Sequence, residues 1–248
     1  MKSITEAKLG KSIGGVTCTC LGVMIHRWLL CAALATALLT GCASAPRNSP
    51  TPHNSARWES AIAEYEAQDR TNAPAPGCIV FTGSSYIKRW TNLVADFPGL
   101  PVVNRGFGGC QLADVYHYAD RIVIPYAPRE VVIYAGGNDI SAKKSPEIVF
   151  GDFVALMEKL RAALPQVKLV FISGPPSPKR WAQTADIRDM NSRIAHYCRR
   201  HDITFVNTFD LMLGLDGLPL PDIYVEDQLH MNAKGYAIWR DAVTPHLK

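Results

Sequence analysis

Short apolar runs alternate along the chain with longer segments in which apolar side chains recur at helical spacing. Each run has three to five mostly apolar residues without strict alternation with polar ones, which is typical of strands covered on both faces. The pattern predicts five strands, at residues 78–82, 101–103, 131–135, 168–172 and 203–206.

The segments between these runs carry the start signals of helices. The sequence SPE at residues 145–147 supplies a serine N-cap, a proline in the first turn and an early acid. Residues 57–70 place apolar side chains at helical spacing among charged ones, which predicts an amphipathic helix. Further helices are expected at residues 111–125, 145–163, 184–200 and 232–247.

This alternation predicts the fold class. Strands joined by long helical crossovers form parallel sheets with right-handed connections. We therefore expect residues 57–248 to form a three-layer α/β/α sandwich around a parallel sheet of about five strands, as in flavodoxin-like folds. Such sheets bind ligands beyond the carboxyl ends of their strands, so candidate chemistry is sought there.

Composition narrows the class of protein. Of the 248 residues, 48% are hydrophobic and 19% charged, which excludes disordered, collagen-like and coiled-coil proteins. After Cys42 the chain has 22 Lys and Arg against 21 Asp and Glu, and no basic run longer than two. Proteins that bind nucleic acid usually concentrate positive charge, so nucleic acid is not an expected partner.

The N-terminal part has the pattern of a targeting sequence. Residues 28–39 are a predominantly apolar run of 12 residues, preceded by His26 and Arg27. A helix of that length does not cross about 30 Å of hydrocarbon, so the run is interpreted as the apolar region of a signal peptide rather than a core helix. The sequence LTGC at residues 39–42 resembles the bacterial lipobox, whose cysteine receives a lipid anchor.

This resemblance implies that Cys42 is lipidated and that the protein is anchored in the bacterial cell envelope. Ala43 at the second mature position favours the outer membrane, facing the periplasm. We expect residues 1–41 to be a leader and signal peptide, with translation starting at Met1 or Met24. Residues 42–56, rich in Ser, Pro and Ala, are expected to be a flexible tether.

Three cysteines remain in the expected domain, Cys78, Cys110 and Cys198. None has the spacing of a zinc site, and no other metal-ligand cluster is visible, so neither a metal nor an organic cofactor is expected. At most one disulfide is possible among them, and the sequence does not choose it.

Two sequence blocks carry a nucleophile and a base. Ser85 follows the first predicted strand in the turn TGSS, where backbone N–H groups can stabilise negative charge, although an ordinary N-cap serine has the same pattern. Asp227 precedes His230 by three residues, so its carboxylate can bind one ring nitrogen and leave the other as a base. His117 lies within a predicted helix, where we expect a surface role.

Two further blocks follow the second and third strands. Residues 104–109 (NRGFGG) lack the dinucleotide fingerprint, because Gln111 stands where the last glycine is required. Residues 135–139 (AGGND) contain Asn138, whose amide can be directed into the crevice. Glycine-rich turns are an alternative for both. Arg180 and Trp181, after the fourth strand, either border the pocket or belong to a rigid connector.

In this order, the four blocks resemble the SGNH superfamily of GDSL-type esterases and lipases, and the resemblance extends over residues 57–247. It implies a Ser85–His230–Asp227 triad, and an oxyanion hole formed by Ser85, Gly109 and Asn138.

The chain departs from the family pattern at two positions. Ser84 replaces the usual aspartate before the nucleophile, and Cys110 follows Gly109 where a small polar residue is common. The position of Ser84 is outside the triad, so we expect altered turn contacts rather than lost activity.

The resemblance implies a serine esterase that needs no cofactor and acts on lipid or small acyl esters, as a lysophospholipase does. An O-acetyl esterase acting on envelope or plant-type polysaccharide is the alternative within the same chemistry. Two alternatives come from other classes: a catalytically idle lipoprotein that binds an envelope component, and a flavodoxin-like cofactor binder.

Overall fold

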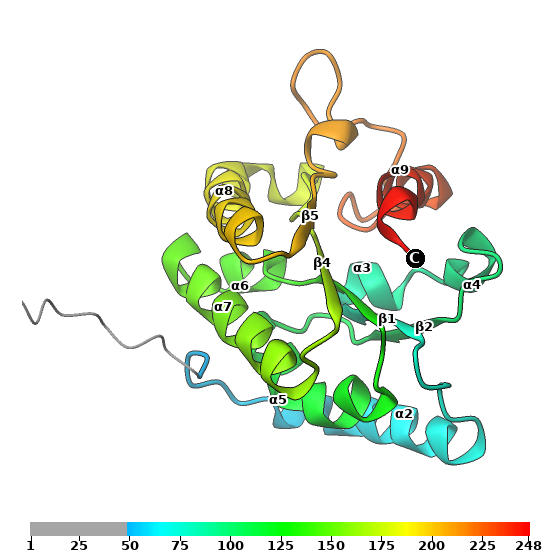
Figure 1. Cartoon of the computed structure of the whole chain (residues 1–248). Coiled ribbons are helices and arrows are strands. Elements are labelled where there is room, and N and C mark those ends of the chain that lie inside the picture. Colours follow the sequence, from blue (N-terminus) through cyan, green and yellow to red (C-terminus); the bar gives the residue numbers. More distant parts are fainter. Residues whose placement is uncertain (1–48) are drawn as a thin grey trace, which may run out of the picture. The chain divides into compact units, whose positions relative to one another are not determined.

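The computed structural model describes residues 49–248 and centres on a parallel sheet of five strands (Figure 1). The strands are β1 (Ile79–Gly83), β2 (Val102–Gly106), β3 (Glu130–Tyr134), β4 (Lys168–Ile172) and β5 (Thr204–Val206). Their order across the sheet is β2-β1-β3-β4-β5, and every neighbouring pair is parallel. The predicted leader, signal peptide and Cys42 lie outside the described residues.

Helices cover both faces of this sheet. One face is covered by α2 (Glu59–Thr71), α5 (Leu112–Ile122), α7 (Pro146–Ala163) and α8 (Thr184–Arg200). The other is covered by α9 (Ala233–Val243) and two short helices, α3 (Ser85–Lys88) and α4 (Leu93–Asp96). The predicted three-layer α/β/α fold is therefore confirmed.

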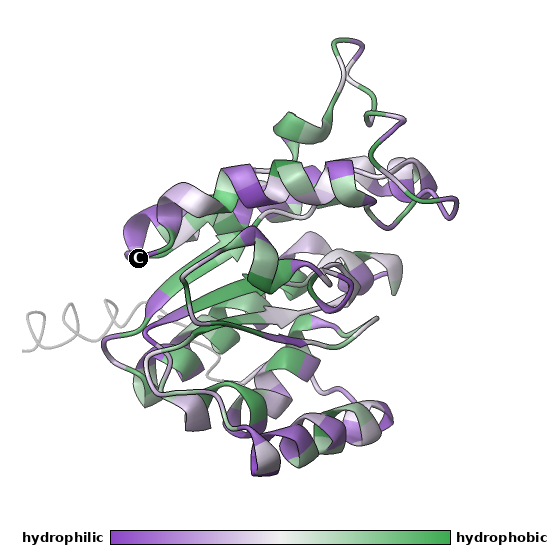
Figure 2. Ribbon diagram, turned by 90° about the vertical axis from the view of Figure 1, so that its right-hand side faces the viewer, coloured by the Kyte–Doolittle hydropathy of each residue, from purple (hydrophilic) through white to green (hydrophobic). Residues whose placement is uncertain are grey.

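The two cores arise from alternation along the strands. Val80 of β1 lies in the core under α2 and α5, whereas its neighbours Ile79 and Phe81 lie in the core under α9. All five residues of β1 are buried, because successive side chains point to opposite faces and each face is covered. Figure 2 shows that the strands are predominantly hydrophobic and the helices more mixed.

Local sequence signals set where the main helices begin. The Ser145 side chain accepts a hydrogen bond from the N–H of Ile148, with Pro146 at the first helical position of α7. Asn232 caps α9 by accepting from Lys234 and Gly235. Each predicted helix is found, with boundaries shifted by a few residues. The one-turn helices α3, α4 and α6 (Gly137–Ser141) are too short to show a periodic pattern. None of them is among the helix ranges expected from the sequence.

The packed part of the chain begins before residue 57, where the sequence analysis places the end of the tether. The Thr51 N–H donates to Asp152 at 2.7 Å, and His53 pairs with Asp114 at 3.1 Å. Ser55 is buried, and its carbonyl accepts from the Tyr118 hydroxyl at 2.8 Å. Residues 51–55 are therefore fixed on the domain by polar contacts, which apolar periodicity does not reveal.

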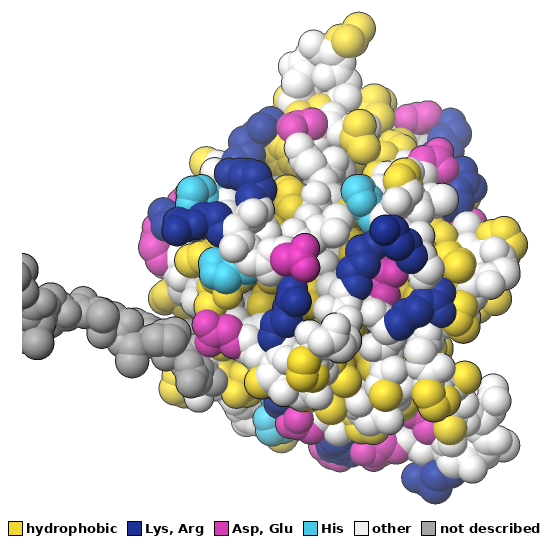
Figure 3. Space-filling model, viewed as in Figure 1, with side chains coloured by type: hydrophobic (Ala, Val, Ile, Leu, Met, Phe, Trp, Pro, Cys, Tyr) yellow, Lys and Arg dark blue, Asp and Glu magenta, His cyan; other side chains and the backbone are white. Residues whose placement is uncertain are grey.

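The amino ends of β3 and β4 lie near the C-terminus. Figure 3 shows Lys and Arg side chains gathered near the C-terminus that Figure 1 marks. In this region Arg129 donates to the Lys248 carbonyl at 2.6 Å, and Lys168 pairs with the buried Glu130 at 3.4 Å. These contacts fasten the C-terminus to the end of the sheet opposite the predicted site.

Three further features concern the described residues. Cys78, Cys110 and Cys198 are all buried and free, so no disulfide joins any two of them. Within residues 49–248, no helix has the length and hydropathy to span a membrane. The connection between β5 and α9 projects from the body, with Leu215 fully exposed (Figure 1).

Candidate active site

A sharp turn at the end of β1 presents Ser85 at the carboxyl edge of the sheet. Gly83 ends the strand with φ +125°, and a Cβ at this position would lie 1.8 Å from the carbonyl oxygen of Tyr134 on β3. Only glycine fits such a close approach of two backbones. The chain therefore turns within two residues and begins α3 at Ser85.

Ser85 is the first member of a chain of three hydrogen-bonded side chains. Its Oγ lies 2.9 Å from Nε2 of His230, and the other ring nitrogen, Nδ1, lies 2.6 Å from Oδ2 of Asp227. The second oxygen of Asp227 accepts the backbone N–H groups of Leu229 and His230 at 2.9 and 2.8 Å. This geometry fixes the imidazole with Nε2 directed at the hydroxyl.

Contacts with two other elements hold the loop that carries His230. The Tyr86 hydroxyl of α3 donates to the Leu229 carbonyl. The Lys179 N–H, from the connection after β4, donates to the Gln228 carbonyl at 3.0 Å. The loop is thereby attached to both sides of the crevice, although Asp227 itself is exposed.

The surroundings of Asp227 favour its ionised form. Partial burial raises its pKa, but the hydrogen bonds from the His230 ring and from the backbone N–H groups of His230 and Leu229 outweigh this. The pKa of Asp227 is therefore held well below its ordinary value. An ionised carboxylate at Nδ1 stabilises the imidazolium that forms when His230 takes a proton.

The predicted oxyanion donors converge on the same hollow as Ser85. Gly109 has φ +81°, and a Cβ there would lie 3.1 Å from the Trp58 ring. The Asn138 amide is fixed at both ends, since its Nδ2 donates to the Cys110 carbonyl at 2.9 Å and its Oδ1 accepts from Arg180 at 2.9 Å. An amide nitrogen has two hydrogens, so one N–H of Asn138 remains for a ligand.

A buried charge network supports this side of the site. Asp139, next to Asn138, accepts the Leu112 N–H at 3.2 Å and pairs with Lys144 at 2.9 Å. Lys144 also pairs with Asp152 of α7 at 2.7 Å. Burial raises the pKa of Asp139 to about 6, against the opposing effect of Lys144. The network joins α6 to the start of α5 and to α7, and so fixes the segments on either side of Asn138 and Gly109.

These side chains face one cavity of about 540 Å³. Its lining residues come from the first three strand ends and from the loops after β4 and before α9: Ser85, Lys88, Arg89, Thr91, Gly108, Gly109, Asn138, Arg180, Leu229 and His230. A second hollow of about 630 Å³ shares Lys88 and Thr91 with this cavity. The cavity around Ser85 therefore adjoins a hollow that is lined in part by residues of β2.

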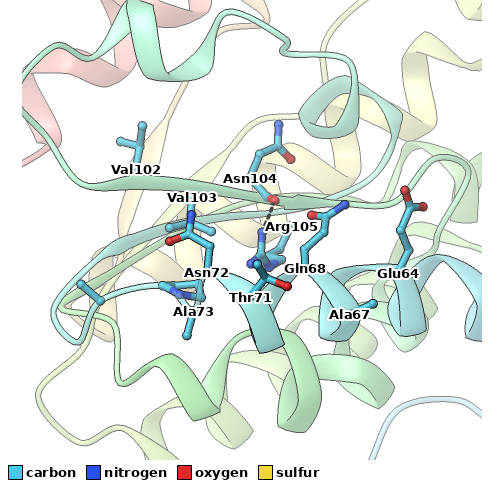
Figure 4. A pocket seen from close by; sticks show the side chains of 12 residues that line it. Glu64, Ala67, Gln68, Thr71, Asn72, Ala73, Val102, Val103, Asn104 and Arg105 are labelled. Atoms are coloured by element: carbon cyan, nitrogen blue, oxygen red, sulfur yellow. Dashed lines mark hydrogen bonds between the residues drawn. The ribbon is translucent and has the colours of Figure 1, made fainter.

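A larger hollow of about 1030 Å³ lies between α2 and β2 (Figure 4). Figure 4 shows Glu64 and Gln68 rising from α2 toward the strand that carries Asn104 and Arg105. None of the predicted triad side chains lines this hollow, so the volume of a hollow does not identify the candidate active site. It shares Glu64, Gln68 and Asn104 with the second hollow and thus continues the same groove.

The structure brings together all five residues that the sequence analysis singled out. Four of them line the cavity of about 540 Å³, and Asp227 lies behind His230. Their catalytic roles remain predictions, since the geometry gives positions and not turnover. His117 is exposed on α5, away from this cavity, in keeping with the expected surface role.

Sequence reasoning did not find the residues that support the site. The sequence leaves Arg180 open between pocket and connector, and in the structure it lines the cavity and contacts Asn138. Lys144 and Asp152 gave no signal, because an ion pair between a turn and a helix has no sequence spacing of its own.

Trp181 is half-buried, whereas Trp90 and Trp239 are buried in the core.

Comparisons with known proteins agree with this fold and identify a family. A family model described as GDSL-like lipase/acylhydrolase matches residues 73–238. No curated protein matches the chain. Among the residues described, no group of three or more His, Cys, Asp or Glu side chains could hold a metal ion.

Several solved structures share the fold. A putative acylhydrolase from Bacteroides fragilis is 24% identical with a TM-score of 0.65, covering 74% of this chain and 94% of that one. A putative platelet activating factor protein from Streptococcus pneumonia is 18% identical with a TM-score of 0.70, covering 89% and 99%. An acetyl-xylooligosaccharide esterase from Geobacillus is 16% identical with a TM-score of 0.55, covering 69% and 94%.

Proposed function

The chain belongs to the GDSL-like lipase/acylhydrolase family, and from this premise we propose that it hydrolyses carboxylic esters with Ser85 as the nucleophile. The observation that carries the proposal is the continuous set of contacts from Asp227 through His230 to Ser85, with distances of 2.6 and 2.9 Å. A base within hydrogen-bond reach of a hydroxyl, itself oriented by a carboxylate, is the arrangement that activates serine.

The first half of the reaction forms an acyl-enzyme. Nε2 of His230 takes the proton of the Ser85 hydroxyl while Oγ attacks the ester carbonyl, and Asp227 stabilises the resulting imidazolium. The imidazolium then gives its proton to the leaving alcohol as the ester bond breaks. In the second half, His230 removes a proton from water, which attacks the acyl group. The imidazolium then returns that proton to Ser85 Oγ as the acyl bond breaks and the acid is released.

The negative charge that develops on the carbonyl oxygen needs donors already in place. We assign these to the backbone N–H groups of Ser85 and Gly109 and to the free N–H of Asn138. Ser85 opens a helix, so its N–H has no acceptor within that helix. Because Arg180 and the Cys110 carbonyl fix the Asn138 amide, little reorganisation is needed when the charge appears.

For the substrate, we propose lipid or small acyl esters, as for a lysophospholipase. The groove that leads from the cavity to the β2 edge gives a reason to keep a second candidate, an O-acetyl ester on a polysaccharide. Polar side chains line that groove, including Gln68, Thr91 and Asn104, and such groups suit an extended polar chain. A binding protein without turnover is the outcome if no ester is cleaved.

We also propose that the protein is a lipoprotein of the bacterial cell envelope, anchored through Cys42 in the outer membrane and facing the periplasm. The support is the LTGC sequence at residues 39–42 after an apolar run. Cys42→Ala should move the protein from the membrane fraction to the soluble fraction and abolish labelling by a radioactive fatty acid. The lipidation proposal would be removed if the wild type took up no labelled fatty acid and Cys42→Ala stayed in the membrane fraction.

Hydrolysis of p-nitrophenyl acetate and butyrate tests the enzymatic proposal. Ser85→Ala and His230→Ala should each lower kcat/KM by about 10³-fold or more, with folding checked by circular dichroism. His117→Ala, at an exposed histidine outside the cavity, is the matched control and should retain activity. Activity that survives Ser85→Ala would show that another residue is the nucleophile.

A further inference from the structure

The cavity that holds Ser85 is lined by three cationic side chains and, apart from the triad, by no acidic one. These cations are Lys88, Arg89 and Arg180, and none of the ten lining residues is Asp or Glu. The rest of the chain offers no reason for such a bias, since Lys and Arg almost balance Asp and Glu after Cys42. The excess of positive charge is therefore a property of this cavity.

Two of the cations come from the end of the short element that carries the nucleophile. Lys88 is the last residue of α3 and Arg89 is its C-cap, three and four residues after Ser85, so both lie on the face that carries the nucleophile. Tyr86 and Ile87, between them, are buried against the core. The element that presents the hydroxyl thus also presents two positive charges to the cavity.

The third cation comes from a different part of the chain, the connection after β4. Arg180 donates to Oδ1 of Asn138 at 2.9 Å, and it is half-buried. A guanidinium has five N–H donors, so this contact leaves several of them free.

None of these three side chains is neutralised by its surroundings. Within residues 49–248, no ion pair joins Lys88, Arg89 or Arg180 to a carboxylate, whereas Arg121, Lys144 and Arg193 are each paired twice. Asp227 is committed to His230 and two backbone N–H groups. Glu64 shares the neighbouring hollow with Lys88 but forms no ion pair with it and does not line the cavity that holds Ser85.

We propose that the preferred substrate is an ester that carries an anionic group, a carboxylate or a phosphate, on the alcohol side of the scissile bond. This proposal rests on the proposed function. Like charges around one cavity repel each other and favour any ligand that brings the opposite charge. Lys88 and Arg89 bind the anionic group, and Arg180 contributes to the field while it positions Asn138.

A series of phenyl acetates that differ in charge tests this preference. The esters are 3-(trimethylammonio)phenyl acetate, phenyl acetate, 4-acetoxybenzoate and 4-acetoxyphenyl phosphate, with charges that run from positive to doubly negative. The value of kcat/KM should rise along the series, by about tenfold from the neutral ester to the carboxylate at low ionic strength. Added salt should flatten the series, because ions screen exposed charges.

Variants separate the proposed preference from intrinsic reactivity. In Lys88→Gln/Arg89→Gln, the ratio of kcat/KM for 4-acetoxybenzoate to that for phenyl acetate should fall about tenfold relative to the wild type. Because both enzymes act on the same two esters, the change in this ratio between wild type and variant cancels the difference between the leaving groups. Lys88→Glu/Arg89→Glu should favour the cationic ester instead. Arg200→Gln, which removes one exposed cation from the end of α8, is the matched control and should keep the wild-type ratio.

A binding measurement distinguishes failure of this inference from failure of the esterase proposal. Ser85→Ala should bind phenyl phosphate more tightly than phenol by calorimetry, and Lys88→Gln/Arg89→Gln should remove that difference. The phosphate and carboxylate esters also show which anion fits better. Equal kcat/KM along the series, or equal losses for neutral and anionic esters in the variants, would overturn the inference while leaving esterase activity intact.

Discussion

Asp227 and Asp139 support the two sides of the catalytic cavity and are stabilised in opposite ways. The Asp227 side chain is 42% exposed in a short loop, and local hydrogen bonds lower its pKa. The Asp139 side chain is fully buried, and burial raises its pKa to about 6 despite the nearby Lys144. One carboxylate takes part in the proposed proton transfer, and the other fixes the backbone around the oxyanion donors.

The comparison shows that two requirements of one site are met by different physics. The triad side needs an ionised carboxylate beside a histidine, and solvent exposure with backbone N–H donors supplies it. The oxyanion side needs donors that do not move, and burial supplies that rigidity at the cost of desolvating charges. We therefore expect mutations on the triad side to change the rate, and mutations behind Asn138 to change stability as well.

The largest expected effect lies on the triad side. Asp227→Asn should lower kcat about 10⁴-fold, as in a comparable triad, because the amide favours the wrong tautomer of His230. The melting temperature should fall only modestly: the ionic contact with His230 is lost, but the remaining oxygen can still accept the N–H groups of Leu229 and His230. A large fall in melting temperature without a loss of kcat would remove the contrast with Asp139. Kinetics with p-nitrophenyl acetate and a thermal melt give both values.

The next effect belongs to the oxyanion side. Asn138→Ala should lower kcat by about 10² to 10³-fold with a smaller change in KM, because the lost donor acts mainly on the developing charge. It also leaves Arg180 and the Cys110 carbonyl without their amide partner, so some loss of stability is expected. A change confined to KM would mean that Asn138 binds the ground state, which would contradict its assigned role.

The opposite pKa shifts predict opposite dependence of stability on pH. The pKa of Asp139 is raised from 3.8 to about 6, so its stabilising contribution is present below about pH 3.8 and is lost as the pH rises through about 6. Relative to Asp139→Asn, the wild type should lose up to about 3 kcal/mol of unfolding free energy between pH 4 and pH 7.

Asp227 provides the control for this measurement. Its pKa is lowered, so its contribution is present above the ordinary pKa of 3.8 and is lost as the pH falls below that value. The unfolding free energies of Asp227→Asn and wild type, measured in urea, should therefore change in parallel from pH 4 to pH 7. If the unfolding free energy of Asp139→Asn also changed in parallel with that of the wild type, burial would not raise the pKa of Asp139.

The smallest effect tests the N-terminal contact with the oxyanion segment. Arg57 donates to the Gly109 carbonyl at 3.0 Å from the exposed surface, and Trp58 lies beside the same glycine. Arg57→Ala should lower kcat about two- to fivefold, because one exposed hydrogen bond restrains that segment only weakly. Arg70→Ala, an exposed residue at the end of α2, is the control. A loss as large as that of Asn138→Ala would place Arg57 in the site itself.

Much of the fold could be predicted from particular sequence patterns. The run CIVFT and its four counterparts mark strands that lie between two layers of helices, and Ser145 with Pro146 marks the start of α7. Both signals are local, because burial of a strand and capping of a helix depend on neighbouring residues. The strand order β2-β1-β3-β4-β5 was not deduced, since it depends on which strands pair across the sheet.

The candidate site divides in the same way. The pairing of Asp227 with His230 is local, because three residues of one turn bring the carboxylate to the ring. Ser85 and His230 are 145 residues apart, and their proximity followed from the family resemblance and from the expectation that functional groups meet at the carboxyl ends of strands. The same expectation did not reveal the contact of Arg180 with Asn138, because it depends on how one loop is folded.

The sequence by itself determined the class of fold, the residues of the predicted triad and oxyanion hole, and the presence of Lys88 and Arg89 beside the nucleophile in the chain. The fold class follows from periodicity, the predicted triad and oxyanion hole follow from the family resemblance of the motifs, and the two cations follow from spacing within one helical turn. Only the tertiary structure decided which charges are neutralised. Lys144 pairs with the buried carboxylates of Asp139 and Asp152, whereas Lys88, Arg89 and Arg180 face a cavity without an acidic partner. Charge compensation depends on distance and burial, and neither is encoded in the order of residues alone.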